Sequence, residues 1–219
     1  MAIASYTYLN HIKEELRKEW PGNRTINLVF HGHSVPAGYF KTPIVKPFSS
    51  YPHLLHRHIK KEYPLACVNA IVTAIGGEGS ISGEKRFSRD VLSHQPDVIT
   101  IDYSLNDRGL NKDEVRQAWS SMIEKSLERK CKIILLTPNF DETFYEKNVR
   151  WEQLVSNAEQ VRELADEYDI GLCDTFMLYE HYLEQGGLLK ELLSQVNHPN
   201  RRGHDMIAYE LYKWYKIND

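Results

Sequence analysis

The sequence predicts an α/β protein: a three-layer α/β/α sandwich built on a five-stranded, parallel, flavodoxin-like sheet. Five short apolar segments follow one another along the chain, and none alternates cleanly between apolar and polar residues, which is typical of strands covered on both faces. Helical patterns separate these segments, and strand–helix alternation favours right-handed crossovers and a parallel sheet. The segments are INLVF (26–30), LACVNAIV (65–72), DVITIDY (97–103), KIILLT (132–137) and DIGLCDT (169–175).

The intervening segments carry apolar residues at helical spacing. At the N-terminus, apolar residues three or four apart from Leu9 to Trp20 predict a short amphipathic helix. Residues 111–130 predict a longer helix, with Asn111 as its N-cap and Glu114 as the capping-box partner. The other helices are expected over 51–63, 83–95, 150–168 and 200–219.

Length and composition narrow the classes of function. The 219 residues contain no linker-like stretch or internal repeat and are interpreted as one domain, 1–219. A net charge of −3 gives no electrostatic basis for binding nucleic acid. No apolar run approaches the roughly 20 residues of a membrane span, and the N-terminus lacks a signal-peptide core, so a cytoplasmic protein is expected. Three cysteines without a spacing pattern predict neither a disulfide framework nor a metal site.

Residues suited to acyl transfer follow the predicted strands. In such sheets, ligands bind beyond the carboxyl ends of the strands. Ser34 follows the first strand, Gly76 the second and Asn106 the third, while His198 precedes the last helix. A serine hydroxyl needs a nearby base, and histidine suits that role because its pKa is close to neutrality. The backbone N–H groups of Ser34 and Gly76 and the Asn106 amide would stabilise an oxyanion.

Each of these residues also has a simpler interpretation. Ser34 alone would suit a helix N-cap, and Asn106 a turn. The glycines at 76–79 lack the lysine of a phosphate-binding loop. The histidines at 53–58 are not spaced to hold a metal on one helix face. Aromatic residues in the loops after the strands suit either a substrate cleft or loop packing: Tyr39, Phe40, Phe48, Phe140, Phe144 and Tyr145.

Four short motifs occur in order on this pattern, and together they resemble the SGNH (GDSL-like) hydrolase superfamily. They are Gly32-His33-Ser34, the glycine Gly76 with Gly79 after it, Ser104-Leu105-Asn106-Asp107, and Gln195-Val196-Asn197-His198-Pro199. The resemblance implies that Ser34 is the nucleophile and His198 the base. It also implies an oxyanion hole made of the Ser34 and Gly76 backbones and the Asn106 side chain. The family hydrolyses esters and thioesters, often acetyl groups on carbohydrate or acyl groups on lipid, and needs no metal or other cofactor.

The chain departs from the family pattern at three positions. His33 replaces an aspartate and Ser104 a glycine, and both changes are expected to be minor. Gln195 stands where the family has its catalytic aspartate. In a serine protease, replacing that acid by its amide lowers turnover by about 10⁴. Either Gln195 or a backbone carbonyl orients His198, or the enzyme is slow, or catalysis is lost; alternatively Asp174 reaches the histidine.

The sequence therefore predicts a serine esterase acting on a small-molecule ester. Small acyl groups are expected, with acetyl groups on carbohydrate slightly favoured, and catalysis is assigned to Ser34 and His198 with Gln195 in the acid position. Two alternatives stay open. One is a lysophospholipase or thioesterase, and the other is a catalytically silent binding protein with the same fold. The sequence leaves the oligomeric state open.

Overall fold

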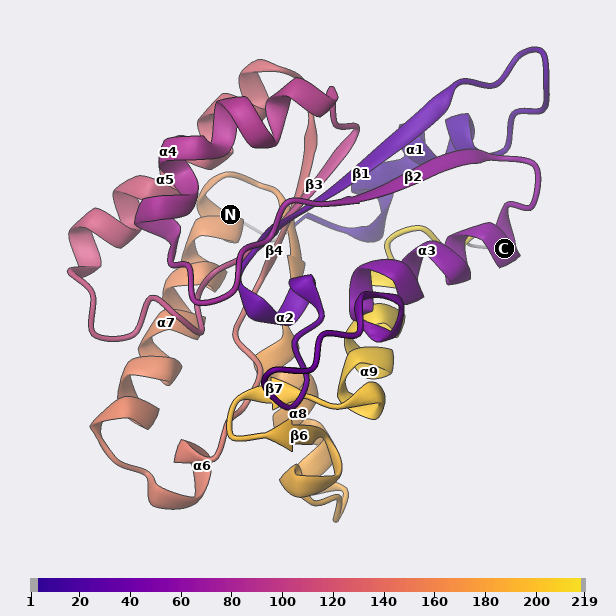
Figure 1. The fold of residues 1–219 in the computed structure, drawn as a ribbon. Coiled ribbons are helices and arrows are strands. Elements are labelled where there is room, and N and C mark those ends of the chain that lie inside the picture. The colour runs from indigo at the N-terminus through magenta and orange to yellow at the C-terminus, as the bar shows by residue number, and fades with distance from the viewer. Residues whose placement is uncertain (1–3, 218–219) are drawn as a thin grey trace.

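A five-stranded parallel sheet forms the centre of the protein. The computed structural model describes residues 4–217, and its strands lie in the order β2-β1-β3-β4-β5 (Figure 1). This flavodoxin-like order is the one predicted. The strands are β1 (Thr25–Gly32), β2 (Cys67–Val72), β3 (Val98–Asp102), β4 (Lys132–Leu136) and β5 (Gly171–Cys173).

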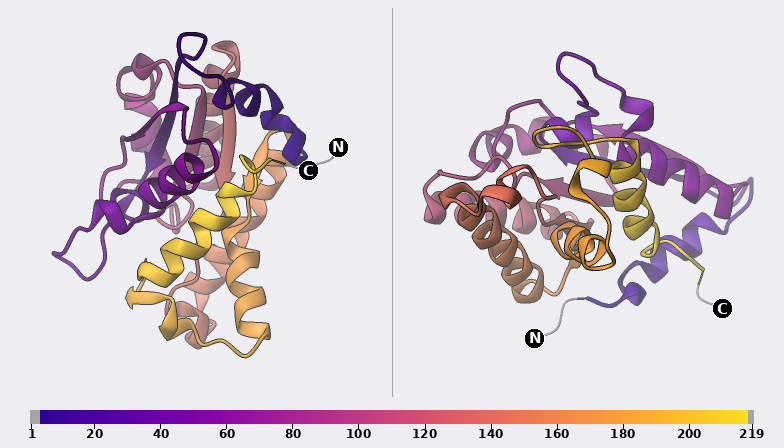
Figure 2. Two further views of the ribbon diagram at one scale, coloured as in Figure 1. Left: turned by 90° about the vertical axis from the view of Figure 1, so that its right-hand side faces the viewer. Right: turned by 90° about the horizontal axis from the view of Figure 1, so that it is seen from below.

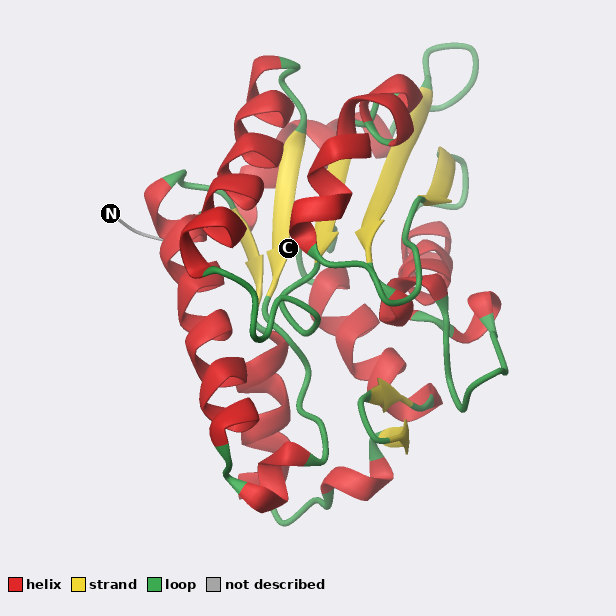
Figure 3. Ribbon diagram, turned by 60° about the vertical axis from the view of Figure 1, so that its left-hand side comes forward, coloured by secondary structure: helices red, strands yellow, loops and turns green. Residues whose placement is uncertain are grey.

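Helices cover both faces of the sheet and complete the three layers (Figures 2 and 3). The first face packs against α1 (Asn10–Leu16), α3 (Tyr51–Glu62), α8 (Thr175–Glu184) and α9 (Arg201–Tyr212). The second face packs against α4 (Ser80–Asp90), α5 (Lys112–Glu128) and the C-terminal half of α7 (Val149–Glu167). Along β1, Leu28 and Phe30 point into the first core and Val29 into the second. Burial on both faces explains why this strand is apolar throughout.

The predicted helices are present with shifted ends; the last two positions of the helix predicted over 200–219 lie outside the described residues. Asn111 caps α5, since its Oδ1 accepts from the backbone N–H groups of Asp113 and Glu114. The N-terminal segment forms a 3₁₀ turn, η1 (Tyr6–Leu9), followed by α1. The prediction that Trp20 belongs to its apolar stripe is wrong, because α1 ends at Leu16 and Trp20 is 85% exposed. Pro21 follows directly and disfavours helical backbone at the residue before it.

Several short elements were not predicted from the sequence. They include α2 (Ser34–Ala37), η2 (Pro47–Ser49), α6 (Thr143–Glu146) and η4 (Leu189–Glu191), and the longer helix α8 was not predicted either. The predicted helix over 83–95 divides into α4 and the 3₁₀ turn η3 (Leu92–His94). A small antiparallel hairpin, β6 (Leu193–Gln195) and β7 (His198–Pro199), precedes α9. Within residues 4–217, no helix has the length and apolar character needed to cross a membrane.

Candidate active site

Ser34 is the first residue of α2, two residues beyond Gly32 at the carboxyl end of β1. The carboxyl end of β1 can lie this close to β3 because Gly32 has no side chain: a Cβ at Gly32 would lie 2.3 Å from the Asp102 carbonyl oxygen. The four-residue helix then ends at Gly38, whose φ of 88° is in the region that favours glycine. Ser34 is 6% exposed, so solvent and substrate reach only a small part of it.

The hairpin formed by β6 and β7 brings His198 to Ser34. His198 Nε2 lies 2.9 Å from Ser34 Oγ, and Nδ1 lies 2.8 Å from the carbonyl oxygen of Phe40. A carbonyl oxygen can only accept, so Nδ1 carries the proton and donates it to Phe40. In the neutral ring, Nε2 is then the unprotonated nitrogen, which is the form that accepts the Ser34 proton.

The surroundings of His198 favour its neutral form. Burial lowers the pKa of His198 below its ordinary value of 6.5; the Phe40 carbonyl works in the opposite direction, and the nearby His33 adds to the lowering. The imidazole is therefore unprotonated at neutral pH. This is the state that a general base requires before it takes a proton.

The sequence left three groups open as the partner of His198 Nδ1: Gln195, Asp174 or a backbone carbonyl. The structure shows a backbone carbonyl, that of Phe40, and Gln195 in the acid position does not make this contact. The Gln195 amide instead bonds to Thr42: its Oε1 accepts from the Thr42 N–H at 2.7 Å, and its Nε2 donates to Thr42 Oγ1 at 3.1 Å. Asp174 is also engaged elsewhere, in a bidentate ion pair with Arg162 at 2.7 and 3.0 Å. Phe40 was missed because every residue has a carbonyl group, so no residue type signals this contact.

His33 caps the short helix that carries Ser34. Its Nδ1 accepts from the Val35 N–H at 3.1 Å, so His33, rather than Ser34, is the N-cap of α2. Its Nε2 lies 3.3 Å from Asp102 Oδ1, without the alignment of a good hydrogen bond. The Tyr51 hydroxyl donates to the other Asp102 oxygen at 3.1 Å. These buried contacts fix the backbone that presents Ser34, and a histidine in place of the family's aspartate is compatible with them.

Two loops place the predicted oxyanion donors at the same edge. Asn106 Nδ2 donates to the Glu78 carbonyl at 3.0 Å, which ties the loop after β3 to the loop after β2. Gly76 lies against Tyr39: a Cβ there would be 2.9 Å from Tyr39 Cζ. The Tyr39 ring centroid is 6.1 Å from that of His198. The loops that carry Asn106 and Gly76 therefore lie beside the Ser34–His198 pair.

Two carboxylates, the buried Asp107 and the partly buried Glu78, hold these loops. Asp107 accepts from the Ser80 N–H at 2.8 Å and from Trp119 Nε1 at 2.9 Å, and burial raises its pKa. Burial alone would also raise the pKa of Glu78, but its hydrogen bonds from Arg86 and Tyr103 outweigh burial and lower it. The loop that contains Gly76 is thus anchored through both carboxylates.

The structure accommodates a serine side chain at position 104, where the family has a glycine. Ser104 is buried, its Oγ is 3.4 Å from the Leu136 carbonyl, and its own carbonyl accepts from Asn157 Nδ2 at 2.8 Å.

The other candidates from the sequence were possible metal ligands and aromatic residues of the loops. Within residues 4–217, no group of three or more histidine, cysteine or acidic residues is arranged to hold a metal ion. Phe140 is buried and packs against Phe144, Trp151 and Phe176, with ring centroids 4.5 to 5.3 Å apart. This part of the aromatic set therefore packs loops, whereas Tyr39 faces the site.

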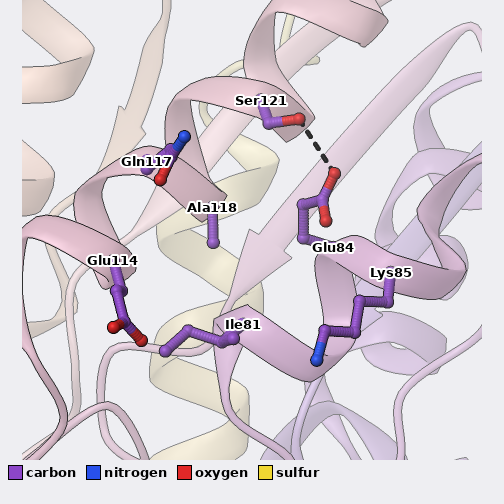
Figure 4. A pocket seen from close by; sticks show the side chains of 7 residues that line it. All are labelled: Ile81, Glu84, Lys85, Glu114, Gln117, Ala118 and Ser121. Atoms are coloured by element: carbon purple, nitrogen blue, oxygen red, sulfur yellow. Dashed lines mark hydrogen bonds between the residues drawn. The ribbon is translucent and has the colours of Figure 1, made fainter.

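A separate pocket lies between α4 and α5 (Figure 4). It has a volume of about 310 Å³, and its polar lining includes Glu84, which accepts from Ser121 Oγ at 2.9 Å. Its lining includes none of Ser34, Gly76, Asn106 and His198.

Solved structures of acetylxylan esterases share this fold. Axe2 from Geobacillus stearothermophilus matches with a TM-score of 0.76 and 20% identity, over 88% of this chain and 95% of that one. The acetyl xylan esterase AlAXEase matches with a TM-score of 0.72 and 22% identity, over 85% and 98%. A two-domain esterase active on acetylated mannans matches with a TM-score of 0.73 and 20% identity, over 98% of this chain and 55% of that one. These likenesses establish the fold.

Sequence comparison identifies the family. No curated protein matches the chain. The profile of the GDSL-like Lipase/Acylhydrolase family, however, matches residues 30–206, most of the chain and all four motifs. The chain therefore belongs to the GDSL-like lipase/acylhydrolase (SGNH) family of carboxylic ester hydrolases.

Proposed function

We propose that the protein is a serine esterase that removes small acyl groups, foremost acetyl, from carbohydrate through an acyl-enzyme. The observation that carries this proposal is the 2.9 Å contact between Ser34 Oγ and His198 Nε2, with the ring held in the basic tautomer by Phe40. A nucleophile, its base and a group that orients the base are the minimum for this chemistry.

Each step follows from the contacts at the site. His198 takes the Ser34 proton while Ser34 Oγ attacks the ester carbonyl carbon. The carbonyl oxygen becomes an oxyanion, which the N–H groups of Ser34 and Gly76 and the Asn106 amide stabilise. When the intermediate collapses, His198 returns the proton to the leaving alcohol oxygen. Water, deprotonated by His198, then attacks the acyl-enzyme, and Ser34 regains its proton as the carboxylic acid leaves.

A carbonyl in place of a carboxylate changes the energetics of the first step. It keeps the ring orientation and tautomer, but it supplies a dipole where a charge would stabilise the imidazolium. The loss of about 10⁴ in turnover when a protease acid becomes an amide includes the wrong tautomer. Because Phe40 sets the right tautomer, the penalty here is expected to be smaller.

The preference for small acyl groups rests on Tyr39. Its ring lies against Gly76 and beside His198. Because these residues are assigned to the oxyanion hole and the base, we expect the reacting carbonyl carbon to lie next to the ring. The ring limits the space for an acyl chain that extends from that carbon. The alcohol part of the substrate is assigned by analogy with the structurally similar esterases, which act on acetylated xylan and mannan.

If the Tyr39 ring limits the acyl group, removing the ring should change the selectivity for acyl-chain length. In Tyr39→Ala, the ratio of kcat/KM for p-nitrophenyl butyrate to that for the acetate is expected to rise about tenfold, because a pocket discriminates methylene groups by roughly this factor. Tyr39→Phe keeps the ring and should keep the parent ratio. An unchanged ratio in Tyr39→Ala would place the acyl group elsewhere.

A panel of esters tests the proposed function. Acetylated xylooligosaccharides, p-nitrophenyl esters of increasing chain length and lysophosphatidylcholine are compared by initial rates, with Ser34→Ala as the blank. Fastest turnover of acetylated sugars is expected. Stoichiometric labelling of Ser34 by a fluorophosphonate without turnover of any ester would instead indicate an intact nucleophile with another substrate. Failure of both labelling and turnover would favour the silent binding protein.

One observation favours a lipid substrate as the second candidate. Ile44, Val45 and Phe48, in the segment between α2 and α3, are 48%, 44% and 77% exposed. Lys41 and Lys46 lie in the same segment. Such a surface suits the edge of a lipid aggregate. Faster hydrolysis of lysophosphatidylcholine than of acetylated sugars would select this candidate.

A further inference from the structure

The loop of residues 38–47 supplies the carbonyl that orients His198. Bonds within the loop shape it: Phe40 N–H donates to Ile44 O at 3.0 Å, and Lys46 N–H donates to Gly38 O at 2.7 Å. Residues 41–47 are all exposed. Phe40 itself is buried, and its ring packs against that of His204 with centroids 5.1 Å apart. The exposed residues that follow have little packing, so polar contacts position this segment and, together with the packing of the Phe40 ring, the direction of the Phe40 carbonyl.

The loop and the β6–β7 hairpin are joined at two points. Gln195 and His198 are paired residues of the hairpin. The Phe40 carbonyl of the loop accepts a hydrogen bond from His198. Two residues further on, Thr42 forms hydrogen bonds with both polar atoms of the Gln195 amide. A displacement of Thr42 would move the Phe40 carbonyl relative to the ring.

We propose that Gln195 is a positioning residue: its amide fixes Thr42, and through it the Phe40 carbonyl, so that His198 keeps the orientation and tautomer of a base. The side chain in the acid position thus acts on the histidine through the loop. The kinetic part of this proposal rests on the proposed esterase function.

Three variants separate the amide's contacts. Gln195→Met keeps the length of the side chain and removes both hydrogen bonds. Gln195→Glu keeps two acceptors, for the Thr42 N–H and the Thr42 hydroxyl. Thr42→Val removes only the hydroxyl contact, and it serves as the second variant if Gln195→Met does not fold.

The activity of these variants is measured with p-nitrophenyl acetate. In Gln195→Met, kcat is expected to fall about tenfold, or about 1.4 kcal/mol, while KM changes less than about twofold, because the base is misoriented and substrate contacts are kept. Gln195→Glu should restore most of kcat. The double variant that combines Gln195→Met with Thr42→Val should lose no more than Gln195→Met alone, since both act through one contact.

A second readout does not depend on turnover. The His198 Nδ1–H resonance, assigned by its absence in His198→Ala, should exchange with water faster in Gln195→Met than in the parent and in Gln195→Glu. If the parent hydrolyses no ester while this pattern holds, the proposed function fails and the positioning stands. If exchange and kcat in Gln195→Met equal those of the parent, the positioning proposal is overturned.

Gln195→Asp tests direct contact with the histidine. The shorter carboxylate should not reach Thr42, so its hydrogen bonds are lost and kcat should fall. It should not replace the Phe40 carbonyl, to which His198 Nδ1 already donates. A rise in kcat together with a raised pKa in the acid limb would show that residue 195 reaches His198 itself, and this result would contradict the proposal.

Discussion

Replacing Ser34 by alanine is expected to lower kcat for ester hydrolysis at least about a thousandfold, because the nucleophile is lost and only binding and oxyanion stabilisation are left. His198→Ala should cost a similar factor, since Ser34 Oγ has His198 Nε2 as its base at 2.9 Å. The double variant should be little slower than either single variant, because the two side chains act in one step. Initial rates with p-nitrophenyl acetate measure all three.

The control for these variants is Ser121→Ala. Ser121 lies in α5 and bonds to Glu84 in the pocket of Figure 4, away from the proposed chemistry. This variant removes the same hydroxyl group and should keep the parent kcat. Equal rates for Ser34→Ala and the parent would exclude Ser34 as the nucleophile and would end the acyl-enzyme mechanism.

Acid is expected to destabilise the fold through two buried histidines. His31 and His204 are both 0% exposed, and burial is the main cause that lowers the pKa of His31 to about 4 and that of His204 to about 3. Arg86 adds to the effect at His31, and His198 adds to it at His204. Neither ring has room for solvent around a positive charge, and no residue among 4–217 forms a hydrogen bond with His204 Nε2.

The sign of the effect follows from proton binding. Below about pH 6.5 the unfolded chain binds protons at both histidines, whereas the folded protein does not, so the free energy of unfolding falls as pH falls. At about pH 4.5, each histidine should have lowered the free energy of unfolding by roughly 2 to 3 kcal/mol relative to neutral pH. The loss levels off only when pH passes below the folded pKa of each ring. Urea unfolding at several pH values between about 7 and 4.5 measures this fall in the free energy of unfolding.

His204→Asn isolates one of the two contributions. The asparagine Oδ1 can still accept the Tyr51 N–H, which His204 Nδ1 accepts at 3.3 Å. The decrease in the free energy of unfolding between pH 7 and 4.5 should be smaller in this variant by about 2 to 3 kcal/mol. His181→Asn is the control, since that side chain is 65% exposed and solvent already reaches it in the folded state. A decrease equal to that of the parent in His204→Asn would show that His204 does not contribute.

The sheet and the location of the site could be predicted from the sequence for a physical reason. Strands buried on both faces must be apolar throughout, as β1 is, and parallel strands end at one edge. Residues that follow different strands, such as Ser34 and Asn106, are therefore brought to that edge whatever the details of the loops. Local chemistry was also readable, as in the capping of α5 by Asn111.

The sequence left a backbone carbonyl open as the group that orients the base, but the residue that supplies it could not be predicted. Phe40 and His198 are 158 positions apart, and Thr42 and Gln195 are 153 apart. Nothing in the residue types pairs them, because the first contact uses a backbone carbonyl and the second an amide that accepts many partners. The sequence by itself determined the fold, the edge that carries the site, and the serine and histidine expected to react. Only the tertiary structure decided what holds the histidine, because the direction of a carbonyl group depends on the path of its loop and on the contacts that fix that path.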